Sequence, residues 1–388
     1  MTGDVLVLRA LGLGDALTGV AALRGLRRAF PGRRLVLAAP ATTGGWLRDL
    51  GLVDAVLPTR ELEPFAWSGT GHVAVNLHGR GPQSHALLAA TRPDRLVAFA
   101  APGFPGGPAF DPEEHEVVRW CRLVAAAGGT CGPQDLRLPE VTSAPAPAPE
   151  DARPEVLLHP GAASGARRWP ADRFAAVGVA LRARGFRVGV TGGPDERELC
   201  AQVVAGVRER GGTAGGGTGD AGDEARDVVD LAGALDLPAL AARVAGAALL
   251  VCGDTGVAHL ATAVATPSVV LFGPVPPRWW RPLLDERRHA VVWHGDDGSP
   301  AGDGGADVVH PWLASVQVPE VLDAVDRVLG AGRAPARPRP SAARSTSTAV
   351  APRPSRTART VGTATPAGPA RAVSRASHVA SVASRPDG

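Results

Sequence analysis

The chain has 388 residues, of which 45% are hydrophobic and 20% charged, a composition typical of a globular protein with a large buried core rather than a fibrous or membrane-spanning one. Its net charge of +3 is unevenly spread, because residues 331–388 hold ten arginines and one acid, a local charge of +9, which leaves residues 1–330 at −6. This distribution disfavours a nucleic-acid-binding surface on the folded part.

The N-terminal residues, MTGDVLVLRALGLGD, have no basic stretch before their apolar run, which Arg9 and Asp15 interrupt. Neither a signal peptide nor a membrane span is predicted. Four cysteines occur without CxxC spacing, namely Cys121, Cys131, Cys200 and Cys252. We therefore expect free thiols in a reducing, cytoplasmic compartment, and neither a metal site nor disulfides.

The first half of the chain alternates short apolar runs with helical patterns. Helices are predicted at 16–30 and 113–128. Buried strands are predicted at 4–8, 34–38, 54–57, 72–77 and 95–99. Residues 139–154 are rich in proline and alanine and predict an extended linker. Residues 1–138 are therefore a first predicted domain.

Residues 155–330 repeat the alternation more regularly. Strands are predicted at 155–159, 186–193, 227–233, 248–253 and 267–273. Helices are predicted at 171–185, 195–210, 237–247 and 257–265. Strands that are apolar throughout and are linked by helices indicate a parallel sheet covered on both faces. The predicted fold class is α/β, with two doubly wound, Rossmann-like domains and a cleft between them, where ligands bind beyond the carboxyl ends of the strands.

Residues 331–388 contain no aromatic residue and no sustained apolar period, so this tail is predicted to be disordered. A solvated appendage is the preferred interpretation of its arginines. Peripheral contact with an anionic membrane surface or polymer is the alternative.

The loop after the strand predicted at 248–253 indicates an anion site. Thr255 can begin a helix whose unpaired N–H groups bind an anion, and Gly256 lets a ligand approach the main chain. His259 lies one turn later on the same face as Thr255. Asp254 would repel a phosphate, so we expect it to accept a hydrogen bond from a ribose or sugar hydroxyl. An ordinary capped helix with a core histidine is the alternative.

A second anion site is indicated by HPGAASGARRWP, residues 159–170. Its small residues leave main-chain N–H groups available, and Arg167 and Arg168 supply positive charge for phosphate oxygens, although a solvated arginine pair is also common. In a third loop, TGGPDERE, Glu196 lies in the first turn of the helix predicted at 195–210, where it can bind ribose hydroxyls or simply favour the helix dipole.

In the first domain, the turn RALGLGDALTG follows the first strand. Its spacing is not the GxGxxG of a dinucleotide site, so Asp15 is predicted to present a carboxylate to the cleft, with an ordinary acid at a helix start as the alternative. Gly14 lies beside it on the acceptor side. A polar surface for a hydroxylated acceptor, or ordinary loop polarity, is indicated by His78, Arg80, Gln83, Ser84 and His85.

With these motifs in this order, residues 4–330 resemble glycosyltransferase family 9, the ADP-heptose:lipopolysaccharide heptosyltransferase type. The resemblance rests on DTGVAH followed by LATAVATPSVVLFGP, on LHPGA with RRWP, and on GLGD near the N-terminus. It implies the GT-B fold, in which two Rossmann-like domains face a central cleft. After FGP the chain departs from the family pattern, which leaves Trp279 and Trp280 either stacked on a base or merely packed.

The resemblance also implies roles for single residues. Asp15 would be the general base. Arg167, where the family usually has lysine, would bind the donor phosphates together with Arg168. Glu196 would bind the ribose and Leu235 would line the base pocket. The diphosphate sugar would be held by Asp254, Thr255, Gly256 and His259.

The implied activity is inverting, metal-independent transfer of a heptose-like sugar from a nucleotide diphosphate sugar to a hydroxyl of a cell-envelope glycan or glycolipid, with no cofactor. A non-catalytic nucleotide-sugar-binding relative is the alternative. An NAD(P)-dependent oxidoreductase is disfavoured because the turn after the first strand, GLGDALTG, lacks the GxGxxG spacing of a dinucleotide site.

Overall fold

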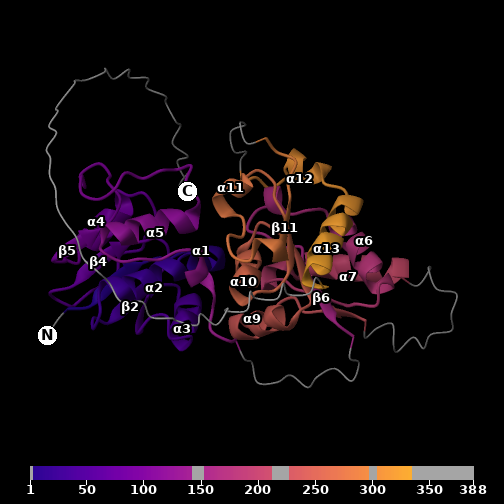
Figure 1. Ribbon diagram of the computed structural model, residues 1–388, viewed down its shortest axis with the longest axis horizontal. Helices are drawn as coiled ribbons and strands as arrows, with labels where there is room; N and C mark the ends of the chain where they lie inside the picture. The colour runs from indigo at the N-terminus through magenta and orange to yellow at the C-terminus, as the bar shows by residue number, and fades with distance from the viewer. Residues whose placement is uncertain (1–2, 142–152, 212–226, 297–303, 334–388) are drawn as a thin grey trace, which may run out of the picture. The chain divides into compact units, whose positions relative to one another are not determined.

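The computed structural model describes residues 3–141, 153–211, 227–296 and 304–333, all within one compact unit, residues 1–335. They form two α/β lobes, each built on a parallel sheet (Figure 1). The first lobe extends to residue 141 and the second begins at residue 153. Most of the predicted linker, and the predicted tail beyond residue 333, lie outside the described residues. No helix among the described residues is both long and apolar enough to cross a membrane.

The first lobe is built on a parallel sheet with the strand order β3-β2-β1-β4-β5. Its strands are β1 (Val5–Leu8), β2 (Leu35–Ala39), β3 (Ala55–Pro58), β4 (Val73–Asn76) and β5 (Arg95–Val97). Its helices are α1 (Leu13–Thr18), α2 (Val20–Ala29), α3 (Ala41–Asp49), α4 (Gln83–Ala89), α5 (Glu116–Ala126) and the 3-10 turn η1 (Pro133–Leu136). Every residue of β1, β2 and β4 is buried, as expected of central strands covered on both faces.

The second lobe is built on a parallel sheet with the order β11-β10-β9-β6-β7-β8, the strand order of a complete Rossmann sheet. Its strands are β6 (Glu155–His159), β7 (Arg187–Val190), β8 (Val228–Asp230), β9 (Leu249–Gly253), β10 (Ser268–Leu271) and β11 (His289–Val292). Its longer helices are α6 (Ala171–Ala183), α7 (Arg197–Gly211), α9 (Leu237–Gly246), α10 (Gly256–Val264) and α13 (Val318–Arg333). Its short helical turns are η2 (Gly165–Arg167), η3 (Pro194–Glu196), α11 (Pro277–Trp280), η4 (Glu286–Arg288) and α12 (Pro311–Ser315).

The strands predicted from the sequence are all present, and β11 is an additional one. The single helix predicted at 16–30 is instead two helices, α1 and α2, which meet at Gly19. A Cβ at Gly19 would lie 2.7 Å from Cδ of Arg9, so this glycine leaves room for a buried arginine side chain. Because α1 already begins at Leu13, Asp15 lies in its first turn.

Different helices cover the two faces of each sheet. In the second lobe α6, α7 and α13 pack on one face, and α9 and α10 on the other (Figure 1). In the first lobe α1, α2 and α5 share one face, while Leu88 of α4 packs on the opposite one. One hydrophobic cluster joins the lobes, because residues such as Leu17 and Leu260 belong to the same core. Near the end of the first lobe, the main-chain N of Leu138 also donates a hydrogen bond to the main-chain oxygen of Ala263 in α10, at 2.9 Å.

We expect Phe174→Ala to lower the free energy of unfolding by about 3–5 kcal/mol. Phe174 is fully buried in the core of the second lobe and meets Trp169 edge to face, with ring centroids 5.1 Å apart. Urea unfolding checks this, with Val308→Ala, at a 76% exposed position, as the control that should change little. Equal unfolding midpoints for the two variants would contradict the packing described here.

Candidate functional site

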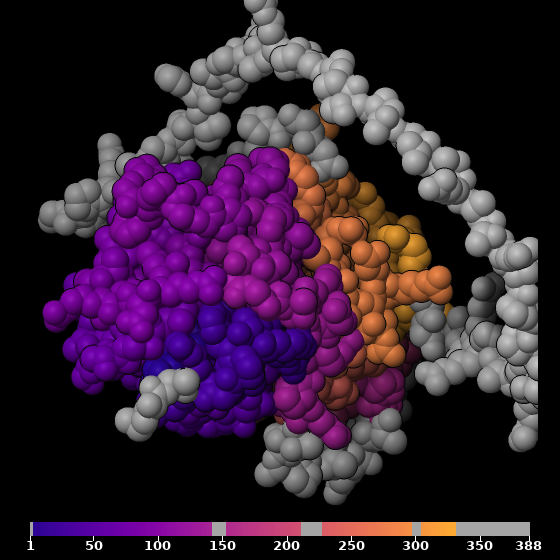
Figure 2. All heavy atoms as spheres, turned by 60° about the vertical axis from the view of Figure 1, so that its left-hand side comes forward, coloured from indigo at the N-terminus to yellow at the C-terminus, as the bar shows by residue number. Residues whose placement is uncertain are grey.

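A cavity of about 860 Å³ lies at the carboxyl ends of strands from both lobes. The first lobe contributes Gly12 to Asp15, which follow β1. The second contributes residues that follow β6, β7, β9 and β10. Of the residues singled out in the sequence, those lining the cavity are Gly14, Asp15, Arg167, Arg168, Glu196, Asp254, Thr255, Gly256, His259 and Trp280. On the face drawn in Figure 2, the indigo-to-violet first lobe adjoins the orange part of the second lobe.

The contact between α1 and α10 brings the two lobes together at this cavity. A Cβ at Gly256 would lie 3.0 Å from N of Gly14 and 3.0 Å from Cβ of Leu13, and a Cβ at Gly14 would lie 3.1 Å from Cδ2 of His259. The sequence predicted that Gly256 would leave room for a ligand. The structure shows a further reason for this glycine, because the first helix of the opposite lobe approaches its main chain.

The N-terminus of α10 opens on the cavity. Thr255 is its N-cap in an extended conformation, with φ −151° and ψ 170°, and its side chain makes no capping hydrogen bond. Helix starts of this kind attract anions through their N–H groups and the helix dipole. One turn on, the His259 ring lies 5.9 Å from the Trp280 ring, between centroids. Burial is the main reason that the pKa of His259 falls to about 4, so its ring is neutral near pH 7.

Arg167 and Asp254 are oppositely charged neighbours on the second-lobe wall of the cavity. Their closest approach, between NH1 and Oδ2, is 3.9 Å. The Nε atom of Arg167 is buried and, within the described residues, has no hydrogen-bond partner. Burial raises the pKa of Asp254 to about 6, with a smaller contribution from the charge of Asp15, while Arg167 opposes the change. A buried donor without an acceptor is costly, and an anionic ligand would supply the acceptor.

Asp15 faces this wall from the first lobe. Its side chain is 31% exposed, and its pKa is raised chiefly by burial and further by the negative charge of Glu116. Arg9, 3.7 Å from Oδ1, and Arg167 both oppose that rise. Asp15 of the first lobe and Arg167 of the second, both predicted from the sequence, thus interact electrostatically across the cavity.

Glu196 and His159 also line the cavity. Glu196 Oε2 accepts a hydrogen bond from Gly193 N at 2.8 Å, so this carboxylate stabilises the turn that begins η3. A Cβ at Gly161 would lie 2.0 Å from Oε1 of Glu196, which explains the glycine in the loop after β6. His159 shares a 3.0 Å hydrogen bond with the Thr191 hydroxyl, and burial lowers its pKa.

Six residues that the sequence analysis placed at the site do not line the cavity, namely Leu235, His78, Arg80, Gln83, Ser84 and His85. Leu235 packs against the core that joins the lobes. Arg80 and Gln83 are exposed. His85 is fully buried beside Phe104, with ring centroids 5.3 Å apart, so its ring cannot reach an acceptor in this conformation.

Other residues near the site were not predicted. His159 and Leu240 line the cavity. Arg9 and Glu116 lie near Asp15 and act electrostatically on its carboxylate. The signal for Arg9 was present in the sequence, because a charge directly after a buried apolar strand requires a buried partner. Glu116 is separated from Arg9 by 107 positions, and only the fold shows that they pair. Among the described residues, no cluster of three or more histidine, cysteine and acidic side chains could hold a metal ion.

Two α/β lobes, each with a parallel sheet and sharing a cavity at their strand ends, are the arrangement that the GT-B prediction requires. Residues 109–297 match the family model described as glycosyltransferase family 9 (heptosyltransferase). Lipopolysaccharide heptosyltransferase 3 of Escherichia coli is 31% identical over 175 residues, which are 45% of this chain and 46% of the relative. The chain thus spans about half the length of this curated relative.

Solved structures share the fold over both lobes. The structure of E. coli ADP-heptose lps heptosyltransferase II has a TM-score of 0.63 at 19% identity and covers 85% of this chain and 100% of that one. The glycosyl transferase family 9 structure from Veillonella parvula DSM 2008 has a TM-score of 0.67 at 17% identity, covering 84% and 97%. The predicted GT-B fold is confirmed, and the predicted family resemblance is matched by the family model over residues 109–297.

We expect Asp254→Asn to stabilise the protein in the absence of ligand, and more so at higher pH. Between its ordinary pKa of 3.8 and about 6 in the fold, the folded protein holds the Asp254 proton more tightly than the unfolded chain does, so the free energy of unfolding falls as the pH rises through this interval. Asparagine removes that loss, which is on the order of 3 kcal/mol at pH 7 and smaller at pH 5.

Urea unfolding at pH 5, 6 and 7 measures this difference. Asp49→Asn, the same substitution at an exposed position of α3, is the control. A stabilisation by Asp254→Asn that does not change with pH would show that the buried charge is not its cause.

Proposed function

We propose that the protein is an inverting glycosyltransferase of the heptosyltransferase type. It moves a heptose-like sugar from a nucleotide diphosphate sugar to a hydroxyl of a cell-envelope glycan or glycolipid. The observation that carries this proposal is that Asp15, Arg167 and the N-terminus of α10 line one cavity. The family match and the ADP-heptose named for the E. coli structure favour ADP-heptose as the donor.

The second lobe would bind the donor diphosphate. As the bond from the sugar to the diphosphate breaks, negative charge grows on the leaving oxygens, and donors aimed at them lower the barrier. Arg167, exposed Arg168 and the N-terminus of α10 supply positive charge at this position without a metal ion. The buried Nε of Arg167 supports this role, because the diphosphate would provide its missing acceptor.

The first lobe would supply the base. Asp15 takes the proton of the acceptor hydroxyl while that oxygen forms a bond to the anomeric carbon and the nucleotide diphosphate leaves with the electron pair of the broken bond. Attack on the side opposite the leaving group inverts the anomeric centre. The raised pKa of Asp15 favours this role, since a carboxylate of higher pKa is a stronger base.

Other second-lobe groups would fix the donor sugar and nucleoside. Asp254 accepts from a sugar or ribose hydroxyl, and neutral His259 donates to the diphosphate or sugar. Glu196 is proposed at the ribose, although part of its carboxylate already binds Gly193 N. Trp280, left open by the sequence, lines the cavity and can stack on a flat or apolar surface of the ligand.

We expect Asp15→Asn to lower the rate of transfer from ADP-heptose by about 10²–10⁴-fold, the usual contribution of a general base. The affinity for ADP should stay within about threefold, because Asp15 lies on the opposite lobe from the proposed phosphate site. Rates from a coupled ADP-release assay and affinities from calorimetry check both statements, with Asp49→Asn as the control. A wild-type rate for Asp15→Asn would remove this residue from the mechanism.

We expect Arg167→Ala to weaken ADP binding by roughly 10- to 150-fold, which corresponds to the loss of about 1.5–3 kcal/mol from a charged hydrogen bond. Calorimetric titration of ADP measures the change. Arg48→Ala, at an exposed position of α3, removes the same charge far from the proposed phosphates and should bind ADP normally. An unchanged affinity in Arg167→Ala would overturn the phosphate assignment.

A further inference from the structure

Arg9 is a buried arginine directly behind Asp15. It follows β1 and is 2% exposed. Its Nε donates to the main-chain oxygen of Asp15, NH1 donates to that of Leu77, and NH2 donates to the Thr18 hydroxyl at 2.9 Å. These bonds fix the first turn of α1 to the ends of β1 and β4. Arg9 reaches the carboxylate of Asp15 only as an ion pair at 3.7 Å.

Glu116, the first residue of α5, is the counter-charge of Arg9. Its Oε1 accepts from Arg9 NH2 at 3.1 Å and from Trp120 Nε1 at 2.6 Å. Its Oε2 accepts from Arg119 NH1 at 2.6 Å. Glu116 is 5% exposed and Arg119 8%, so the pair is shielded from water. A buried carboxylate with three donors is held in one position.

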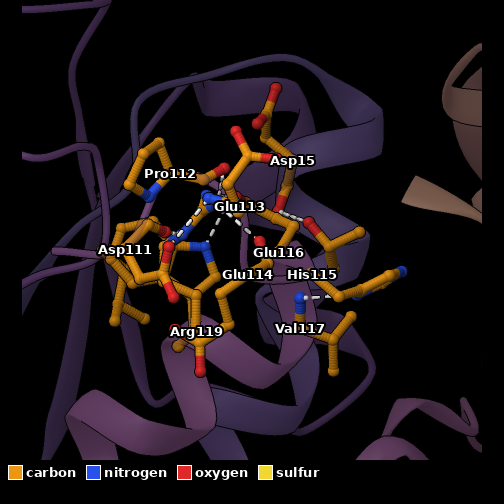
Figure 3. Close-up of polar contacts among 12 residues, drawn as sticks. Asp15, Asp111, Pro112, Glu113, Glu114, His115, Glu116, Val117 and Arg119 are labelled. Atoms are coloured by element: carbon orange, nitrogen blue, oxygen red, sulfur yellow. Dashed lines mark hydrogen bonds and ion pairs between the residues drawn. The ribbon is translucent and has the colours of Figure 1, made fainter. Parts of the chain in front are cut away.

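Arg119 in turn holds the segment that precedes α5. Its remaining N–H groups donate to the main-chain oxygens of Asp111, Pro112 and Glu114, at 3.0, 3.1 and 2.6 Å. Figure 3 shows these acceptors gathered around Arg119, with the carboxylate of Asp15 directed away from them. Arg119, Glu116, Arg9 and Asp15 therefore form a line of alternating charge that ends at the cavity.

We propose that Glu116 and Arg9 are positioning residues for Asp15. They hold its carboxylate toward the cavity, and Glu116 occupies Arg9 so that the arginine does not bind that carboxylate directly. This inference rests on the proposed role of Asp15 as the base. Without Glu116, the nearest remaining counter-charge for Arg9 would be Asp15, which would become a weaker base and would be held by a direct hydrogen bond.

Several other groups act on Asp15 or on this line of charges. Arg167 and Asp254 face Asp15 from the second lobe. His259 of α10 and His78 after β4 lie near Arg9, and their pKa values are lowered to about 4, chiefly by burial, so they are neutral near pH 7. Near neutral pH, the charges that Arg9 can pair with are therefore those of Glu116 and Asp15.

The test is Glu116→Gln in the full chain. The ¹³C signals of the aspartate carboxyl carbons are titrated by NMR, with Asp15 assigned by its loss in Asp15→Asn. We expect a lower pKa of Asp15 in Glu116→Gln, an acid limb of the kcat profile displaced to lower pH, and a plateau kcat reduced about 10–10²-fold. ADP affinity should stay within about threefold. An unchanged pKa of Asp15 overturns the proposal.

Two further variants make the result specific. Glu114→Gln is the matched control, because Glu114 pairs with Arg122 at 2.7 Å rather than with Arg9, and it should leave the pKa of Asp15 unchanged. The double variant Glu116→Gln, Arg119→Gln keeps the buried charge balanced if the single variant does not fold, and should still lower that pKa. If the wild type transfers no sugar, the proposed function fails, while the titration still decides whether Glu116 controls Asp15.

Discussion

The structure depends on the close approach of two helix starts from different lobes. Gly14 of α1 and Gly256 of α10 leave their main chains exposed to one another, since a Cβ on either would meet atoms of the opposite helix at 3.0–3.4 Å. That approach brings Asp15 within electrostatic reach of Arg167 and Asp254. A ligand between the lobes therefore meets an acid on one side and a polarised, basic wall on the other.

The charges that line the cavity reduce the stability of the fold. The negative charge of Asp15 contributes to the raised pKa of Asp254, and Arg167 has a buried N–H without an acceptor among the described residues. Such arrangements reduce the stability of a fold and are common at functional sites, where the ligand relieves the cost. The buried charges of Arg119, Glu116 and Arg9 differ from those at the cavity, because most of their donors and acceptors already form hydrogen bonds within the fold.

The sequence was informative where one local pattern determines one element. Uninterrupted apolar runs predicted the parallel strands, and the loops after β1, β6 and β9 contain most of the residues that line the cavity.

The predictions from sequence failed where contacts between distant segments determine the local structure. A continuous helical pattern over 16–30 gave no sign of the break at Gly19, where the absence of a side chain leaves room for Arg9. His85 was expected near the acceptor because it follows a polar loop, whereas tertiary packing buries it against Phe104. Helix α3 contains two adjacent glycines and weak helix formers, so its pattern was too faint to detect.

A crystal structure of the protein with ADP would locate the diphosphate in the cavity. It should show the diphosphate oxygens within about 3.2 Å of the Arg167 guanidinium and of main-chain N–H groups at the start of α10, with the Asp15 carboxylate facing the terminal phosphate across the cavity. ADP bound elsewhere, or bound here with its phosphates away from Arg167 and α10, would contradict the central claim.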